Sequence, residues 1–301
     1  MTALDLDHLR RWIGSTEQQT DLVTAYAVNA LRGTLELASG EDAPAPEARV
    51  PITQHWCLAL QTEPISRLAR DGHARLGGFL PPVPLPRRMW AGGDLSFHDS
   101  LRVGDTVERV SRVVDVQGKQ GRTGPLCFVT VAQEFSTARG LAVRETHVLV
   151  YRDTRDAGRP AETTPPDRNA QRTASEAAAT PSQGEQGPTH WQCVVDIDAV
   201  RLFRYSALTF NGHRIHYDRD YCREEGYSGL LVHAPLQVSL LTEFAHSIKA
   251  GQAPRTFTYR AVRPLFDGTS IALRAAATND GLDLWIATPD GVRTMSAKAA
   301  W

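Results

Sequence analysis

Hydrophobic and polar residues alternate with a period of two in two separate parts of the chain. In residues 94–152 the alternating runs are rich in Val and are separated by the turn sequences VGD, QGKQGRTG and ARG, which predicts four antiparallel strands. Residues 257–301 alternate between the turns FDG, NDG and PDG and predict three or four more. Residues 191–209 open with a further strand. Antiparallel sheet therefore dominates the predicted fold.

Helical periodicity precedes both groups of strands. Residues 229–249, GLLVHAPLQVSLLTEFAHSIK, are apolar on nearly every side and predict a long helix at the centre of a fold. In the first half, the spacing of apolar residues predicts two short helices within residues 7–37 and another in residues 55–72. Residues 77–94 are rich in Gly and Pro and predict an extended loop.

A long polar segment separates the two halves. Residues 153–190 contain no Ile, Leu, Val, Met, Phe, Tyr, Trp or Cys, so burial cannot offset the entropy of ordering them. We interpret this segment as a flexible linker rather than a partner-binding tail. The predicted organisation is an N-terminal domain of residues 1–152, the linker, and a C-terminal domain of residues 191–301.

The two halves follow the same plan. The stretch FHDSLRVGDTVERVSRV, residues 97–113, matches RAVRPLFDGTSIALRAA, residues 260–276, in having a strand, a Gly or Asp turn and a second alternating strand. This likeness indicates an internal duplication. A central helix wrapped by an antiparallel sheet, present twice, predicts an α+β fold of the double hot-dog type, which by itself fixes no function.

The composition argues against nucleic acid and membranes as binding partners. Of the 301 residues 42% are hydrophobic and 22% are charged, and 33 Lys and Arg balance 34 Asp and Glu, so no strong field would recruit nucleic acid or a membrane. The N-terminus resembles no signal peptide and no apolar run is long enough to span a bilayer, which predicts a cytoplasmic protein. The four cysteines are scattered singly and are predicted to be free thiols.

Three stretches carry a family resemblance. FRYSALTFNGHRIHYDRDY (residues 203–221), GLLVHAPLQ (residues 229–237) and residues 77–113 together resemble the MaoC-like hydroxyacyl-thioester dehydratase type 2 family, which includes mesaconyl-C4-CoA hydratases and is related to (R)-specific enoyl-CoA hydratases. The resemblance covers most of the chain outside the linker and the extreme N-terminus. It implies reversible hydration of an α,β-unsaturated acyl thioester, with an acyl-CoA or acyl carrier protein substrate and no cofactor.

Hydration of such a thioester requires a base for water, an acid for the α-carbon and donors for the enolate oxygen. The resemblance places His216 at the catalytic histidine, but five residues earlier Asn211 stands where related hydratases have Asp. Asparagine can orient water but cannot take up its proton. His216 is therefore expected to act as general base and acid with Asn211 positioning water, while Asp218 is better explained as a helix cap.

Other candidates surround this motif or lie in the first half. His233 and Ala234 begin the long helix, where unpaired backbone N–H groups favour a thioester oxygen. His213 is expected to bind substrate or a structural group, since no third metal ligand with suitable spacing follows it. Candidate contacts to substrate or CoA are Arg214, which would otherwise pair with a surface acid, and Arg88 and Trp90 of the segment PLPRRMW.

Two alternative functions stay open at this level. A hot-dog thioesterase would use a carboxylate on the central helix, for which Glu243 is available. A non-catalytic acyl-thioester-binding subunit would account for the asparagine at position 211. The first half, which has no second copy of the NxxxxH motif and in which His55 and His98 are isolated, is expected to supply the acyl pocket and the CoA groove. Pairing of two chains into a homodimer is compatible with this plan.

Overall fold

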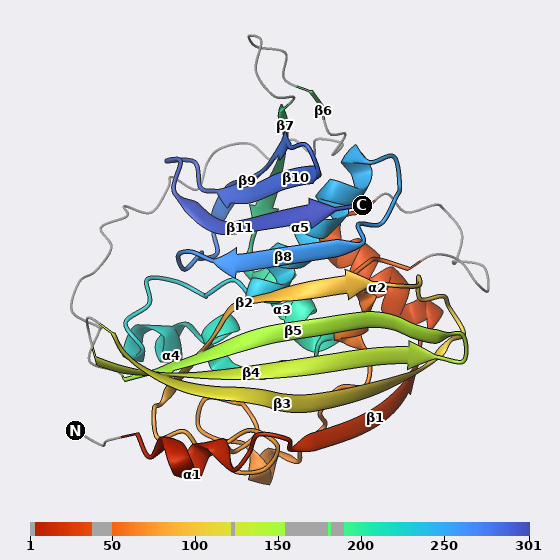
Figure 1. The fold of residues 1–301 in the computed structure, drawn as a ribbon. Coiled ribbons are helices and arrows are strands. Elements are labelled where there is room, and N and C mark those ends of the chain that lie inside the picture. Colours follow the sequence, from red (N-terminus) through yellow and green to blue (C-terminus); the bar gives the residue numbers. More distant parts are fainter. Residues whose placement is uncertain (1–3, 38–49, 122–123, 154–179, 182–189) are drawn as a thin grey trace.

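The strands form one antiparallel sheet in a computed structural model that describes residues 4–37, 50–121, 124–153, 180–181 and 190–301 (Figure 1). The order across the sheet is β1-β3-β4-β5-β2-β8-β11-β10-β9-β7-β6. The strands of the first half are β1 (Thr16–Leu22), β2 (Arg87–Phe97), β3 (Thr106–Gly121), β4 (Gly124–Thr137) and β5 (Gly140–Arg152). Those that follow are β6 (Thr180–Pro181), β7 (His190–Ile197), β8 (Thr256–Ala261), β9 (Thr269–Ala277), β10 (Gly281–Ala287) and β11 (Arg293–Ala300).

The sheet has an internal two-fold plan centred on the β2–β8 pair. Outward from this pair, β5, β4, β3 and β1 on one side correspond to β11, β10, β9 and β7 on the other. A capped helix follows each outer strand: the Thr24 side chain accepts from the N–H of Ala27, and the Asp198 side chain accepts from the N–H of Arg201. The duplication predicted from the sequence is thus present in the strand order.

The helices are α1 (Leu6–Arg10), α2 (Ala25–Leu35), α3 (Ala199–Leu208), α4 (Arg219–Glu224) and α5 (Ala234–Ile248), with short 3-10 turns η1 (Gln54–Cys57), η2 (Ile65–Arg67) and η4 (Arg214–His216). Helices α2, α3 and α5 gather on one face of the sheet (Figure 1). Helix α5 packs against β8, β9, β10 and β11. Its side chains are buried around most of its circumference, among them Leu236, Val238, Leu241 and Phe244, as its apolar sequence predicts.

The two halves differ in their helices. The described residues between α2 and β2 contain only η1 and η2, so that part of the first half has no counterpart of α5. The helix predicted for residues 55–72 is therefore wrong. Gln54, His55, Trp56 and Cys57 are all buried, whereas residues 61–67 are all exposed, so the apolar positions of this segment do not form one buried helix face.

Two strands were also misread from the sequence. The first of the two helices expected in residues 7–37 is reduced to α1, because Thr16–Leu22 pairs as an edge strand with β3, and this backbone pairing does not require apolar side chains. The loop expected in residues 77–94 ends in β2 instead. Glycine is needed there for close backbone approach: a Cβ on Gly92 would lie 2.7 Å from the oxygen of Tyr259, and one on Gly93 would lie 2.5 Å from that of Thr146.

The remaining predictions have mixed outcomes. Most of the expected linker, residues 153–190, lies outside the described residues, and of the part that is described Thr180–Pro181 pairs with β7. The four cysteines are free thiols, and three of them, Cys57, Cys127 and Cys222, are buried. Within the described residues, no helix has both the length and the apolar character needed to cross a bilayer.

Candidate active site

The motif residues lie in an irregular segment between α3 and α4. Helix α3 ends at Leu208, and Phe210 then adopts a left-handed backbone with φ +48°, which turns the chain sharply before Asn211. The turn η4 brings Ile215 and His216 into the core, and Asp218 caps α4 by accepting from the N–H groups of Asp220 and Tyr221. The prediction of a capping role for Asp218 is confirmed.

His216 is buried in a single tautomer. Its Nδ1 lies 2.6 Å from the backbone oxygen of Leu231, which can only accept, so Nδ1 carries the proton and Nε2 presents a lone pair. Burial lowers the pKa of His216 to about 4, partly offset by the bond to Leu231. The ring is therefore neutral at physiological pH, which is the form required of a base.

His233 lies directly against His216 at the start of α5. The two rings stack with centroids 3.6 Å apart and planes 19° apart. The Oγ of Ser206 lies 2.8 Å from Nε2 of His233, while Nδ1 is buried without a hydrogen-bond partner. Burial lowers the pKa of His233 as well, with the charges of His216 and His213 acting in the same direction. Because His233 is the N-cap residue of α5, the helix begins beside this pair of rings, and Pro235 lies in the first turn, where an N–H has no intrahelical partner.

Asn211 and His213 complete the second-half part of the site. The Oδ1 of Asn211 accepts from the backbone N–H of His213 at 3.0 Å, so this oxygen is already used in a local turn. His213 is buried, and its ring meets that of His216 edge-on with centroids 5.5 Å apart. Burial lowers its pKa, and the nearby charges of His73 and His216 lower it further. The NH2 group of Asn211 and the second lone pair of its Oδ1 are the parts of this side chain that can still contact another molecule.

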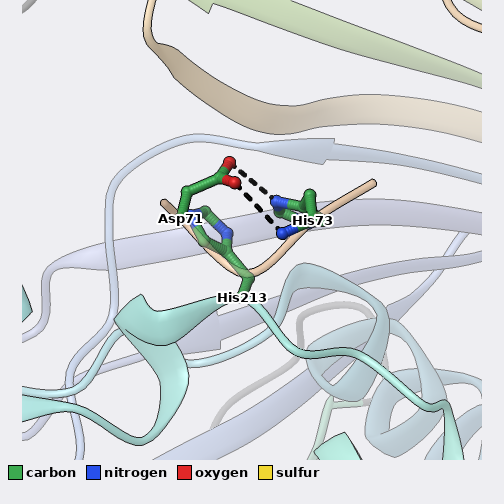
Figure 2. A group of neighbouring side chains, drawn as sticks. All are labelled: Asp71, His73 and His213. Atoms are coloured by element: carbon green, nitrogen blue, oxygen red, sulfur yellow. Dashed lines mark hydrogen bonds and ion pairs between the residues drawn. The ribbon is translucent and has the colours of Figure 1, made fainter. Parts of the chain in front are cut away.

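The first half contributes two residues that the sequence analysis missed. Asp71 and His73 come from the loop that connects η2 to β2, and Figure 2 shows them beside His213. The His73 ring lies 4.2 Å from the His213 ring, centroid to centroid. Asp71 accepts from the Nδ1–H of His73 and from its backbone N–H, both at 3.0 Å. Asp71 was expected near the end of a helix over residues 55–72 and His73 just beyond it, and nothing in the local pattern pairs either residue with a motif so distant in the sequence.

The ionisation of this pair follows from its surroundings. Burial alone would raise the pKa of Asp71, but the hydrogen bonds and charge of His73 hold it below its usual range, so the carboxylate is ionised. Burial and the charge of Arg88 lower the pKa of His73 to about 4, while Asp71 acts in the opposite direction. Arg88 also lowers the pKa of His213. The site thus combines neutral imidazoles, one carboxylate and one guanidinium.

Asp71, His73 and His213 also have the composition of a metal site. One ligand atom from each lies within 4.8 Å of the others, a grouping found among the residues that the structure describes. Two features oppose a cation there: Nδ1 of His73 is already bonded to Asp71, and the positive charge of Arg88 already disfavours positive charge on His73 and His213. The arrangement is better suited to proton transfer than to metal binding.

The other candidate residues have partners of their own. Arg214 binds Asp218 through Nε at 3.0 Å and Nη2 at 2.7 Å and packs over the Tyr221 ring, so the surface acid considered from the sequence is its partner here. Trp90 stacks on His147 and donates to the hydroxyl of Tyr259 at 2.7 Å. A substrate contact for either side chain stays a prediction.

Glu243 lies far along α5 from His233 and the rings beside it, and close to His246 instead. Its Oε1 accepts from the backbone N–H of Ile52 at 2.7 Å. It follows Ala234 by nine positions on α5, which corresponds to about 13 Å along the helix axis. The carboxylate proposed for a thioesterase therefore supports the packing of the first half rather than facing His216.

Burial of a neutral His216 predicts that acid destabilises the fold. Its pKa is about 4 in the folded protein and about 6.5 in an unfolded chain, so between these values only the unfolded state binds the proton and stability falls as pH falls. The expected loss from this residue is about 2 kcal/mol at pH 5. The free energy of unfolding, measured with urea between pH 7 and pH 5, should depend less on pH in His216→Gln than in wild type. The exposed His190 provides the control, since His190→Gln should keep the wild-type slope. Identical slopes in both variants would contradict the assignment.

Comparison with known proteins gives a consistent family. The family model of hydroxyacyl-thioester dehydratase type 2 matches residues 53–267. A mesaconyl-C(4)-CoA hydratase from Chloroflexus aurantiacus is 39% identical over 289 residues, which cover 95% of this chain and 95% of the relative. The matched region includes the loop of Asp71 as well as the motif of His216.

Solved structures resemble the fold. A MaoC-like dehydratase superposes with a TM-score of 0.67 at 15% identity, covering 97% of this chain and 99% of that one. A Mycobacterium tuberculosis protein described as having a double hot-dog fold gives a TM-score of 0.58 at 14% identity, with 95% of each chain covered. These likenesses confirm the predicted double hot-dog fold.

Proposed function

The chain belongs to the hydroxyacyl-thioester dehydratase type 2 family of hydro-lyases, and from this membership we propose that it hydrates an α,β-unsaturated acyl-CoA thioester, reversibly, at the cluster around His216. The observation that carries the proposal is the state of His216: a buried neutral imidazole with its tautomer fixed by Leu231. The Nε2 lone pair of His216 supplies the base, and the backbone N–H groups at the start of α5 supply donors for the developing negative charge.

In the hydration direction, Nε2 of His216 accepts a proton from water as the water oxygen bonds to the β-carbon. The π electrons move toward the thioester oxygen, where N–H groups at Ala234 and the start of α5 stabilise the enolate. The imidazolium of His216 then returns a proton to the α-carbon, which restores the neutral ring. The amide of Asn211 and the ring of His213 orient the water and the acyl group.

The charge of Arg88 favours a substrate whose acyl group contains a carboxylate. Its charge lies close enough to His73 and His213 to lower the pKa of both. A guanidinium whose charge reaches His73 and His213 suits a dicarboxylic acyl group better than a plain alkyl chain. The Chloroflexus relative is named for mesaconyl-C(4)-CoA, which supports the same choice. We assign residues 1–152 the wall of the acyl pocket and part of the CoA groove, and residues 191–301 the reacting motif.

The test is absorbance at the enoyl-thioester band with crotonyl-CoA, mesaconyl-C4-CoA and itaconyl-CoA, with a thiol reagent run in parallel. We expect loss of the band without release of free thiol, fastest with a carboxylated substrate. Thiol release would identify a thioesterase instead. No change with any of the three would contradict the proposed reaction.

A further inference from the structure

The active site lacks a carboxylate where the motif would have supplied one, and another segment brings one in. Asn211 stands at the position at which related hydratases have Asp, and its Oδ1 is committed to the N–H of His213. We propose that Asp71, acting through His73, is the counter-charge that stabilises the imidazolium formed on His216 during proton transfer. This inference rests on the proposed function and adds a positioning unit from the first half of the chain.

The loop of Asp71 is docked on the motif by its backbone. The backbone oxygen of Asp71 accepts from the N–H of Arg214 at 2.9 Å. Gly72 and Gly212 face each other so closely that a Cβ on Gly72 would lie 1.9 Å from the Gly212 oxygen, and one on Gly212 would lie 2.8 Å from the Gly72 oxygen. An ion pair between Arg70 and Glu224 of α4 holds the same loop from outside. The position of Asp71 relative to the histidines is therefore fixed by several contacts.

The side chains continue from this docked backbone as a row. Asp71 binds His73, the His73 ring lies 4.2 Å from His213, the His213 ring lies 5.5 Å from His216, and His216 stacks on His233 at 3.6 Å. With Nδ1–H of His73 donated to the carboxylate, Nε2 of His73 carries the lone pair that faces away from Asp71. The row connects the carboxylate to the base through imidazoles alone.

The charges around the row show why a carboxylate is needed. A positive charge on His216 would form next to the His73 ring, whose own charge opposes it, and beside His213 and His233, whose pKa values a charged His216 lowers. The Arg88 guanidinium opposes a positive charge on His73 and on His213. Asp71 is the anion that raises the pKa of both His73 and His213. By polarising these rings it offsets the developing positive charge, which is the part a carboxylate plays behind a catalytic histidine.

Asp71→Asn tests this assignment, because asparagine keeps the acceptor for the backbone N–H of His73 but removes the charge. We expect kcat to fall by about 10- to 100-fold with KM nearly unchanged, and Asp71→Glu to recover part of the loss. Asp220→Asn makes the same change at a side chain that is 76% exposed and paired with Arg223, and it should leave kcat unchanged. Circular dichroism verifies that each variant is folded.

A second readout does not depend on turnover. NMR titration of the ring protons should show lower pKa values for His73 and His213 in Asp71→Asn than in wild type, because their counter-charge is gone. If Asp71→Asn does not fold, His73→Gln replaces it, since glutamine can still donate to Asp71, and it should lower kcat equally.

The inference is overturned if wild type is active and Asp71→Asn matches Asp220→Asn in kcat, or if the histidine pKa values are unmoved. In either case the proposed hydratase reaction stands. Failure of the wild-type protein on the thioester panel is a separate result, which rejects the proposed function instead.

Discussion

His216→Gln is expected to lower kcat by about 10³-fold or more, which is the range associated with loss of a general acid–base group. Glutamine can still donate a hydrogen bond to the backbone oxygen of Leu231 and has a similar reach, so the variant removes proton transfer while keeping the local contact. KM should change little, because the ring serves the reaction rather than the attachment of CoA. Initial rates on the preferred enoyl thioester, together with a thermal melt, measure both effects.

The exposed His190 again gives the matched control, and His190→Gln should retain wild-type kcat and KM. A folded His216→Gln protein with more than about a tenth of wild-type kcat would rule out His216 as the base. Buried His233, stacked on the same ring, would then be the next candidate.

The sequence predicted the part of the site that is local in the chain. Asn211, His213 and His216 lie within six residues of one another, and the segment that follows predicted both the start of α5 and the position of His233 beside it. These inferences needed only short-range spacing and helix-capping chemistry. The family resemblance supplied the reaction, and the strand pattern supplied the duplicated fold.

The missing part of the site is non-local. Asp71 and His73 reach His213 only because the loop after η2 folds back onto the second half, and no periodicity in that loop encodes the contact. The helix predicted for residues 55–72 also hid the contact, since it placed Asp71 in the last turn of a helix rather than in a loop that reaches the second half. The contact leaves a signal in the sequence at Gly72 and Gly212, because such a close approach of two backbones requires residues without a Cβ.

This glycine contact yields the second large expected effect. In Gly72→Ala the new Cβ would lie 1.9 Å from the backbone oxygen of Gly212 and 2.8 Å from its carbonyl carbon, so one of the two segments must move. The left-handed φ of +89° costs alanine about 1–2 kcal/mol, and overpacking adds about 1–3 kcal/mol. Displacing Asp71 and the motif by about 1 Å should lower kcat by about 100-fold. Urea unfolding and initial rates measure the two consequences.

Gly77→Ala is the control that distinguishes the steric clash with Gly212 from the cost of placing alanine at a positive φ. Gly77 lies between η2 and β2 as well and has a similar φ of +98°, but its Cβ would meet only Pro82, at 3.8 Å. The free energy of unfolding of this variant should fall by about 1–2 kcal/mol, which is the cost of alanine at positive φ. Its activity should be unchanged. If Gly72→Ala and Gly77→Ala were equal in stability and in kcat, the loop would not be held against the catalytic segment. A larger loss of both in Gly72→Ala would mean that the two halves of the chain build one active site, with the geometry of His216 depending on a loop that contains none of the motif.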